Sequence, residues 1–172
     1  MKKKPNNPAR VSKAEQRVVI AKDALNQLKL EKYIAQTGRY TSPNLSRELE
    51  EKANGDERQQ AKPFLLKTTV SCEVCAKGAL FLSAIRKYNN ATVNAVMCDN
   101  MRVAENIFGK KQFDMIEACF EQWDITVTGG DGTVGDPVPD NVQNFGLAYV
   151  KNNHRLQAIL KNIIKNKGTF KP

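Results

Sequence analysis

The sequence predicts a mainly α-helical protein, a compact domain of about five to seven helices that allows one short β-hairpin or strand pair. Apolar residues recur every three or four positions in most segments, which is the spacing of one helix face. Helix-starting pairs, Ser12 with Glu15 and Ser42 with Pro43, stand in front of two of these segments. The chain has 172 residues, 41% of them hydrophobic, which is enough for one domain with a buried core.

The first helix is predicted over 12–30, behind a flexible basic arm at 1–11. The arm contains two prolines and clustered lysines. Ser12 and Glu15 have the spacing of a capping box, in which each side chain bonds the backbone of the other residue. The remainder, 12–172, is expected to form a single mainly helical domain.

The middle of the chain predicts three further helical regions. A polar helix is expected over 42–53, where serine and proline start it. Residues 64–70, FLLKTTV, are apolar and β-branched, and they fit either a short strand or an extended lead-in. The next helix is expected over 71–88. The region 92–108 is expected to be either one helix or a pair of short helices interrupted at 98–100.

The last third predicts two helices separated by a long loop. The helix over 111–123 has one apolar stripe and one acidic stripe, and the acidic stripe is interpreted as its solvent face. That stripe consists of Asp114, Glu117 and Glu121. The segment 124–140 is rich in Gly, Asp and Pro and predicts the loop. The final helix starts at an Asn cap near 152, and Gly168 stands where a C′ glycine belongs.

Cys72 and Cys75 form a CxxC pair in front of an apolar run. A structural zinc site needs a second close pair of ligands, whereas Cys98, Cys119 and the only histidine stand apart. A redox pair needs a βαβ frame, and no alternation of strands and helices surrounds this pair. Buried cysteines at the small-residue start of a core helix are therefore favoured. A thiol- or zinc-dependent protein centred on Cys72 and Cys75 is kept as an alternative.

The positive charge is concentrated at both ends of the chain. The net charge is +9. Residues 1–22 carry seven Lys or Arg against one Glu, and residues 151–172 carry six and no acid. Basic ends of this kind favour phosphate or an acidic partner, although a solvated surface explains them equally well. The basic surface of the last helix is expected to consist of Arg155, Lys161 and Lys165.

Two further regions predict anion binding. One loop combines a guanidinium, a phenol ring and hydroxyls, which suits stacking and phosphate contacts. The predicted helix over 71–88 has hydroxyls and free amides at its start and two cations at its end. The candidate residues are Arg39, Tyr40, Thr69, Ser71, Arg86 and Lys87. The single histidine allows no Cys/His or Ser/His pair, so neither enzyme activity, nor a catalytic residue, nor a cofactor is predicted.

Four segments, taken in order, resemble a family of small uncharacterised proteins encoded by bacteriophages and prophages. They read AKDALNQLKLEKYIAQTGRYTSP, CEVCAKGALFLSAIRKYNN, FDMIEACFEQWD and RLQAILKNIIKNKGTFKP. The resemblance implies a phage-type binding protein that neutralises or redirects a host factor, as in anti-defence or host takeover. It supplies no catalytic residues.

The expected place of action is the host bacterial cytoplasm. Four cysteines without a secretion signal fit a reducing compartment, and no stretch of 18 apolar residues predicts a membrane span. The expected partner is an anionic nucleotide signal or a host protein, and a homo-oligomer fits as well. A nucleic-acid-binding accessory protein that uses its basic termini is the second hypothesis.

Overall fold

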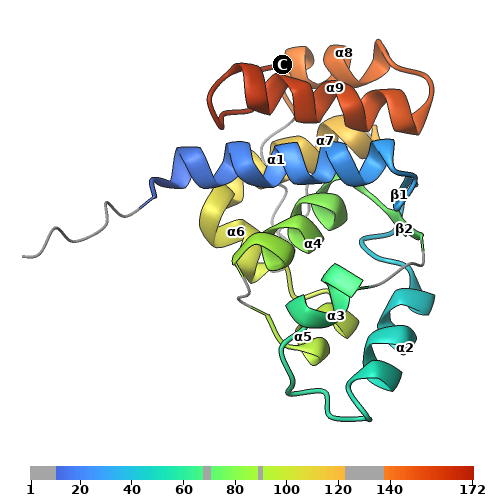
Figure 1. The fold of residues 1–172 in the computed structure, drawn as a ribbon. Helices are drawn as coiled ribbons and strands as arrows, with labels where there is room; N and C mark the ends of the chain where they lie inside the picture. Colours follow the sequence, from blue (N-terminus) through green and yellow to red (C-terminus); the bar gives the residue numbers. More distant parts are fainter. Residues whose placement is uncertain (1–10, 68–70, 89–90, 123–137) are drawn as a thin grey trace, which may run out of the picture.

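Nine α-helices and two short β-strands make up the part of the chain that the computed structural model describes, residues 11–67, 71–88, 91–122 and 138–172 (Figure 1). The elements are α1 (Lys13–Lys29), β1 (Tyr33–Ala35), α2 (Pro43–Lys52), α3 (Lys62–Lys67), β2 (Cys72–Val74), α4 (Ala76–Tyr88), α5 (Val93–Met97), α6 (Arg102–Phe108), α7 (Lys110–Glu121), α8 (Asp140–Leu147) and α9 (Asn152–Lys165). The mainly helical fold with one strand pair is confirmed. Helices α3 and α8 were not expected.

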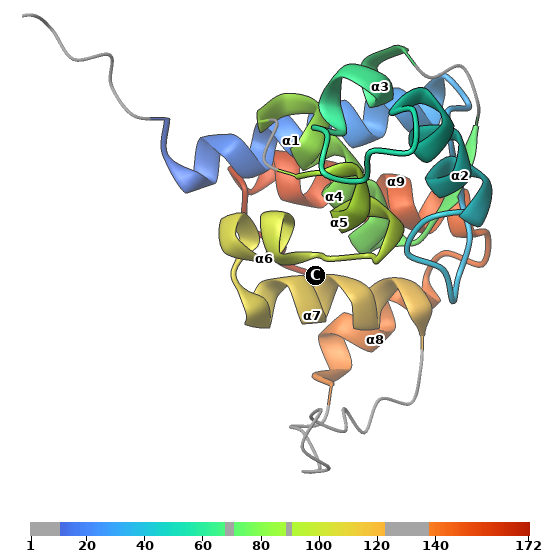
Figure 2. The ribbon, with the colours of Figure 1, turned by 90° about the horizontal axis from the view of Figure 1, so that it is seen from below.

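Helix α4 is the central element of the fold. Every residue from Ala76 to Ile85 is buried. The helix packs against α1, α3, α6 and α7, and Figure 2 shows it in the middle of these helices. Its sequence suits this position because small residues near its start let neighbouring backbone approach, and bulky residues such as Phe81 and Leu82 fill the core.

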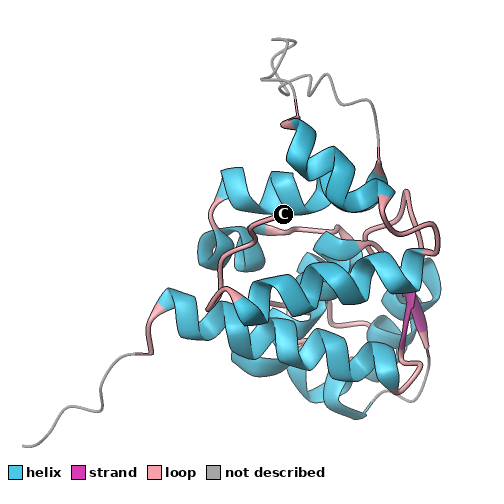
Figure 3. Cartoon of the chain, turned by 90° about the horizontal axis from the view of Figure 1, so that it is seen from above, coloured by secondary structure: helices cyan, strands magenta, loops and turns pink. Residues whose placement is uncertain are grey.

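The two strands form a parallel pair at the edge of the helical body (Figure 3). Tyr33 lies opposite Cys72, and Ala35 lies opposite Val74. The helix predicted from Ser71 is therefore wrong at its start, because residues 72–74 pair with β1 and α4 begins only at Ala76. Both alternatives for 64–70, a short strand and an extended lead-in, are wrong for 64–67, which belong to α3.

The predicted starts of α1 and α2 are confirmed, whereas the Asn cap predicted for the last helix is wrong, because Lys151 is the N-cap residue of α9 and Asn152 is its first helical residue. The Ser12 hydroxyl accepts the Glu15 N–H at 3.2 Å, and the Glu15 carboxylate accepts the Ser12 N–H at 2.8 Å, which completes the capping box of α1. Ser42 caps α2, and Pro43 occupies its first turn. Of the two forms expected for 92–108, the pair of short helices is present, as α5 and α6.

Helices α7, α8 and α9 form the other side of the molecule. Helix α8 packs on α7, and α9 packs on both α7 and α1 (Figure 1). Most of the predicted loop at 124–140 lies outside the described residues, as do residues 1–10 of the predicted arm. Where the chain is described again, Val138 is buried and Asp140 begins α8.

Helix α9 ends in a Schellman motif. The N–H of Gly168 donates to the carbonyl of Ile163 at 2.8 Å, and the N–H of Lys167 donates to Ile164 at 3.2 Å. Lys167 takes the left-handed C′ position at φ +52°, so Gly168 stands one residue later than expected. A side chain on Gly168 would lie 2.4 Å from the carbonyl oxygen of Ala14 at the start of α1.

Candidate functional site

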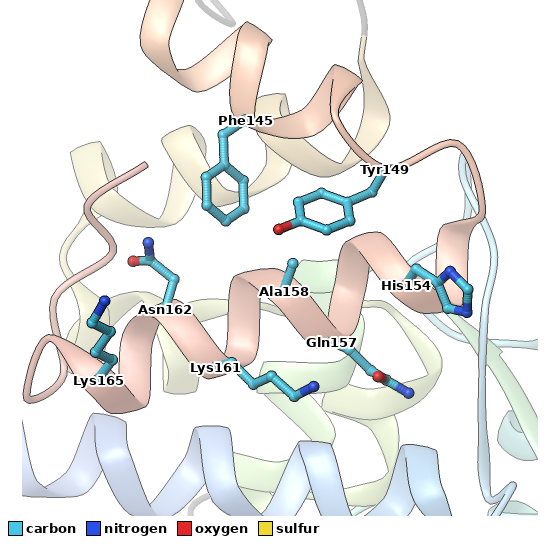
Figure 4. Close-up of a pocket in the computed structure, with 8 residues that line it drawn as sticks. All are labelled: Phe145, Tyr149, His154, Gln157, Ala158, Lys161, Asn162 and Lys165. Atoms are coloured by element: carbon cyan, nitrogen blue, oxygen red, sulfur yellow. The ribbon is translucent and has the colours of Figure 1, made fainter.

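An open groove runs between α8 and α9 (Figure 4). It encloses about 410 Å³. Its lining residues are Phe145, Tyr149, His154, Gln157, Ala158, Lys161, Asn162 and Lys165. A volume of this size lies within the range of small-molecule sites, about 300–1,000 Å³.

The α8 side of the groove is aromatic. The rings of Phe145 and Tyr149 lie 5.6 Å apart at 52°, and Figure 4 shows both facing α9. Phe170 meets Phe145 edge to face at 5.6 Å and holds its ring in place. On the opposite side α9 presents Ala158, whose methyl group leaves room in front of the rings.

The α9 side of the groove is basic. Lys161 and Lys165 are exposed, and neither forms an ion pair with any residue in the described part of the chain. His154 stands at the opposite end from Lys165 (Figure 4). No Asp or Glu occurs between Lys151 and the last residue, so α9 itself offers no acid that would neutralise these cations.

The prediction that Arg155 belongs to the basic surface of the last helix is wrong, because its side chain is buried, whereas Lys161 and Lys165 are exposed. Arg155 is only 5% exposed, and its guanidinium points into the protein. It donates to the carbonyls of Phe120 at 2.7 Å, of Gly146 at 3.1 Å and of Tyr149 at 2.8 Å. It also donates to the Gln122 side chain at 2.8 Å. Arg155 therefore joins the carboxyl ends of α7 and α8 to α9 and fixes the aromatic side of the groove.

Arg39 and Tyr40 lie in the loop between β1 and α2. Arg39 is about half exposed and pairs with Glu73 at 3.9 Å, a long contact between two exposed groups that contributes little to stability. The Tyr40 hydroxyl donates to Glu117 at 2.7 Å. Burial, together with this carboxylate, raises the pKa of the Tyr40 phenol. The hydroxyl of Tyr40 is therefore bound to α7, whereas the guanidinium of Arg39 remains about half exposed to solvent.

The acidic stripe of α7 is not a solvent face, which corrects the sequence interpretation. Lys77 of the buried helix α4 forms ion pairs with Asp114 at 2.9 Å and with Glu117 at 2.5 Å. Glu121 is 8% exposed and accepts the N–H of Gly38 at 2.7 Å. The stripe therefore holds α4 and the β1–α2 loop against α7.

Glu121 gives a testable dependence of stability on pH. Burial raises its pKa above the ordinary value of 4.5 although the Gly38 N–H opposes this. The pKa of Glu121 is higher in the folded state than in the unfolded state. Its protonated form therefore contributes to the free energy of unfolding below pH 4.5, and this contribution is lost as the pH rises through the folded-state pKa. Glu121→Gln keeps an oxygen acceptor for Gly38 and should gain stability relative to the unchanged protein between pH 4 and pH 7, measured by urea unfolding.

A matched control for this comparison is Glu31→Gln, which changes an exposed carboxylate. Its stability relative to the unchanged protein should vary little over the same range. A Glu121→Gln variant that is less stable than the unchanged protein at pH 7 would contradict the assigned cause, the cost of burying the charge.

Arg86 and Lys87 both pair with the buried carboxylate of Asp23. The distances are 3.1 Å from Arg86 Nε and 3.0 Å from Lys87 Nζ. Arg86 also donates to the carbonyl of Leu65 at 2.6 Å. These contacts join α4 to α1 and α3; Arg86 is largely covered, whereas Lys87 stays exposed while it pairs with Asp23. Ser71 is exposed but precedes a strand instead of starting a helix, and Thr69 lies outside the described residues.

Cys72 and Cys75 are buried side chains of the core. Cys72 lies on β2, and Cys75 directly precedes α4. Burial raises the pKa of each thiol to about 12, which disfavours the thiolate that redox chemistry and metal binding need. Within the described residues no three His, Cys, Asp or Glu side chains are grouped so that they could hold a metal ion. The thiol or zinc alternative gains no support from this geometry.

The chain matches no protein-family model, no curated protein and no solved structure. The resemblance to phage-encoded proteins therefore stays a prediction. In the described part of the chain, every helix is too short or too polar to cross a membrane.

The sequence reading found the cations of the groove and missed its aromatic side. Phe145 and Tyr149 follow the Gly/Asp/Pro-rich segment, and no element was assigned to them. A signal was present, because Val142, Phe145 and Tyr149 stand three and four positions apart, which is helical spacing.

Proposed function

We propose that this chain is a non-enzymatic binding protein whose α8–α9 groove takes an anionic ligand with a planar ring, of the nucleotide type. One observation carries the proposal: the same groove has two aromatic rings on one side and the exposed cations of α9 on the other. Aromatic rings stack on nucleobases, and lysine ammonium groups bind phosphate as point charges.

The state of the two lysines supports this assignment. Lys161 and Lys165 have no ion-pair partner among the described residues, so a phosphate would not have to displace an internal carboxylate. Arg86 and Lys87 differ in this respect, because Asp23 already neutralises much of their charge. The groove is therefore the better candidate for the predicted nucleotide site.

The biological role that we propose follows from the phage resemblance. A chain that binds a nucleotide-type signal in the bacterial cytoplasm neutralises it by lowering its free concentration, with no chemical step. Nucleic acid is the second candidate ligand, because every charged side chain from Lys151 onward is basic. Binding to nucleic acid would weaken steeply with salt, since each phosphate contact releases counterions.

The test compares two double variants of equal charge change. Lys161→Gln with Lys165→Gln removes both lysines of the groove, whereas Lys22→Gln with Lys29→Gln removes two exposed lysines of α1 that do not line it. Titration calorimetry would use the four ribonucleoside 5′-monophosphates. We expect the groove variant to bind at least about tenfold more weakly, because one lost charge-assisted hydrogen bond of about 1.5 kcal/mol has that effect.

The α1 variant should bind as the unchanged protein does. Equal losses in the two double variants would show that net charge, and not the groove, governs binding. Absence of binding to all four nucleotides by the unchanged protein would overturn the proposal.

A further inference from the structure

We infer that the groove accepts one nucleotide-sized ligand, with its ring over Ala158 and its phosphate toward Lys165, and excludes an extended nucleic-acid strand. This inference rests on the proposed function and specifies its ligand class. It follows from the backbone near both ends of the groove and from the order of side chains along α9.

The C-terminal segment lies near the Lys165 end of the groove. Asn162 donates to the carbonyl of Lys171 at 2.6 Å and accepts the N–H of Lys171 at 2.8 Å. Phe170 is buried against Phe145, and Asn141 at the start of α8 reaches the carbonyl of Pro172 at 3.5 Å. The segment therefore extends from α9 toward α8, and Figure 4 shows it rising beside this end of the groove.

The turn between α8 and α9 lies near the His154 end of the groove. It is held by Arg155, which donates to the carbonyl of Tyr149 through Nη2 at 2.8 Å and through Nε at 3.1 Å. The carbonyl of Gly146, one turn earlier, accepts from the same guanidinium. Backbone therefore lies near both ends of the groove, and a strand running along it would have to leave through its open side.

The dimensions favour a discrete ligand. His154 and Lys165 are 11 residues apart on one helix, which corresponds to about 16 Å at 1.5 Å per residue. Sites for single-stranded nucleic acid extend over about 4–16 nucleotides along an open channel. A groove of this length and of about 410 Å³, with backbone near both ends, suits one nucleotide.

The order of side chains along α9 gives the ligand an orientation. Ala158 faces the rings of Phe145 and Tyr149 across the groove (Figure 4), and we place the base between Ala158 and these rings. Lys161 follows one turn later and Lys165 two turns later, at about 4.5 Å and 10.5 Å along the helix axis. Both lysines follow Ala158 along α9, but Figure 4 shows the Lys161 side chain directed away from the rings and Lys165 at the far end of the groove. We therefore place the phosphate toward Lys165, with Lys161 at the edge of the groove.

The experiment compares ligands of different length on the full chain. The probes are the four ribonucleoside 5′-monophosphates, the matching nucleosides and a mixed-sequence DNA octamer without terminal phosphates. We expect the best monophosphate to bind at least tenfold more tightly than its nucleoside and more tightly than the octamer. An octamer that binds as tightly as the monophosphate would overturn the inference, as would a nucleoside that binds equally well.

A pair of variants locates the ring. Ala158→Leu fills the space in front of Phe145 and Tyr149, whereas Ala148→Leu adds the same side chain at an exposed position outside the groove lining. We expect at least a tenfold loss for Ala158→Leu and no loss for Ala148→Leu, with unchanged circular dichroism in both. Unchanged binding by Ala158→Leu would overturn the ring position.

The two levels of proposal fail differently. If no nucleotide, nucleoside or octamer binds, the proposed function is overturned and the inference with it. If the octamer binds best and the variant lacking Lys161 and Lys165 loses that binding, the site stands but the inference about a single nucleotide is wrong.

Discussion

Arg155→Met is expected to lower the free energy of unfolding by at least about 3 kcal/mol, because several buried acceptors would each lose a partner at about 1–3 kcal/mol. These acceptors are the carbonyls of Phe120, Gly146 and Tyr149, with the side chain of Gln122. Methionine fills similar volume without hydrogen-bond donors. Urea unfolding at pH 7 measures the change.

The control for this prediction is Lys161→Met on the same helix. It also replaces a cation by methionine, but at an exposed position, so the stability should change by no more than about 0.5 kcal/mol. Arg155→Lys should remain well below the unchanged protein, since an ammonium cannot reproduce the fork of the guanidinium. A loss of less than 1 kcal/mol for Arg155→Met would refute the role given to Arg155.

Gly78→Ala is expected to destabilise the protein by about 3 kcal/mol, at the upper end of overpacking costs. A Cβ at this position would lie 1.5 Å from the carbonyl oxygen of Tyr40 and 2.6 Å from its carbonyl carbon. Both atoms belong to backbone, so either the β1–α2 loop or α4 must move. Thermal or urea unfolding measures the loss.

The sign of this effect is itself a control. Helix propensity alone predicts a gain of about 1 kcal/mol when glycine inside a helix becomes alanine. A second readout is hydrogen exchange of the Cys75 amide, which donates to the carbonyl of Arg39 at 2.7 Å in the same loop. A displaced loop should speed this exchange, whereas a stabilised variant with slow exchange would contradict the close contact at Gly78.

Local signals predicted the helices because their causes are local. The capping box at Ser12 and the proline at the start of α2 act within one turn, and both were readable from the sequence. Strand β1 was missed because three residues carry almost no periodicity, and its partner Cys72 is far away in the chain. The same distant pairing moved the start of α4 from Ser71 to Ala76.

Charged side chains were the least readable part of the candidate site. A basic residue on a helix is usually exposed. The residues next to Arg155 in the sequence give no sign that it is buried among carbonyls of α7 and α8. The acidic stripe of α7 misled for a related reason, because its partner Lys77 lies inside an apolar helix. Lys161 and Lys165 were readable as cations, but the rings that complete the groove come from an element that had not been assigned.

The packing of α1 against α9 has a consequence for synthesis on the ribosome. The residues of α1 that face α4 can pack once the chain has been synthesised to Tyr88. The residues of α1 that face α9 can pack only once it has been synthesised to Lys165. At about 5–20 residues per second, that interval is on the order of ten seconds. A contact of such high sequence separation also slows folding. The face of α1 that packs on α9 is therefore covered only after α9 has been synthesised, later than the face that packs on α4.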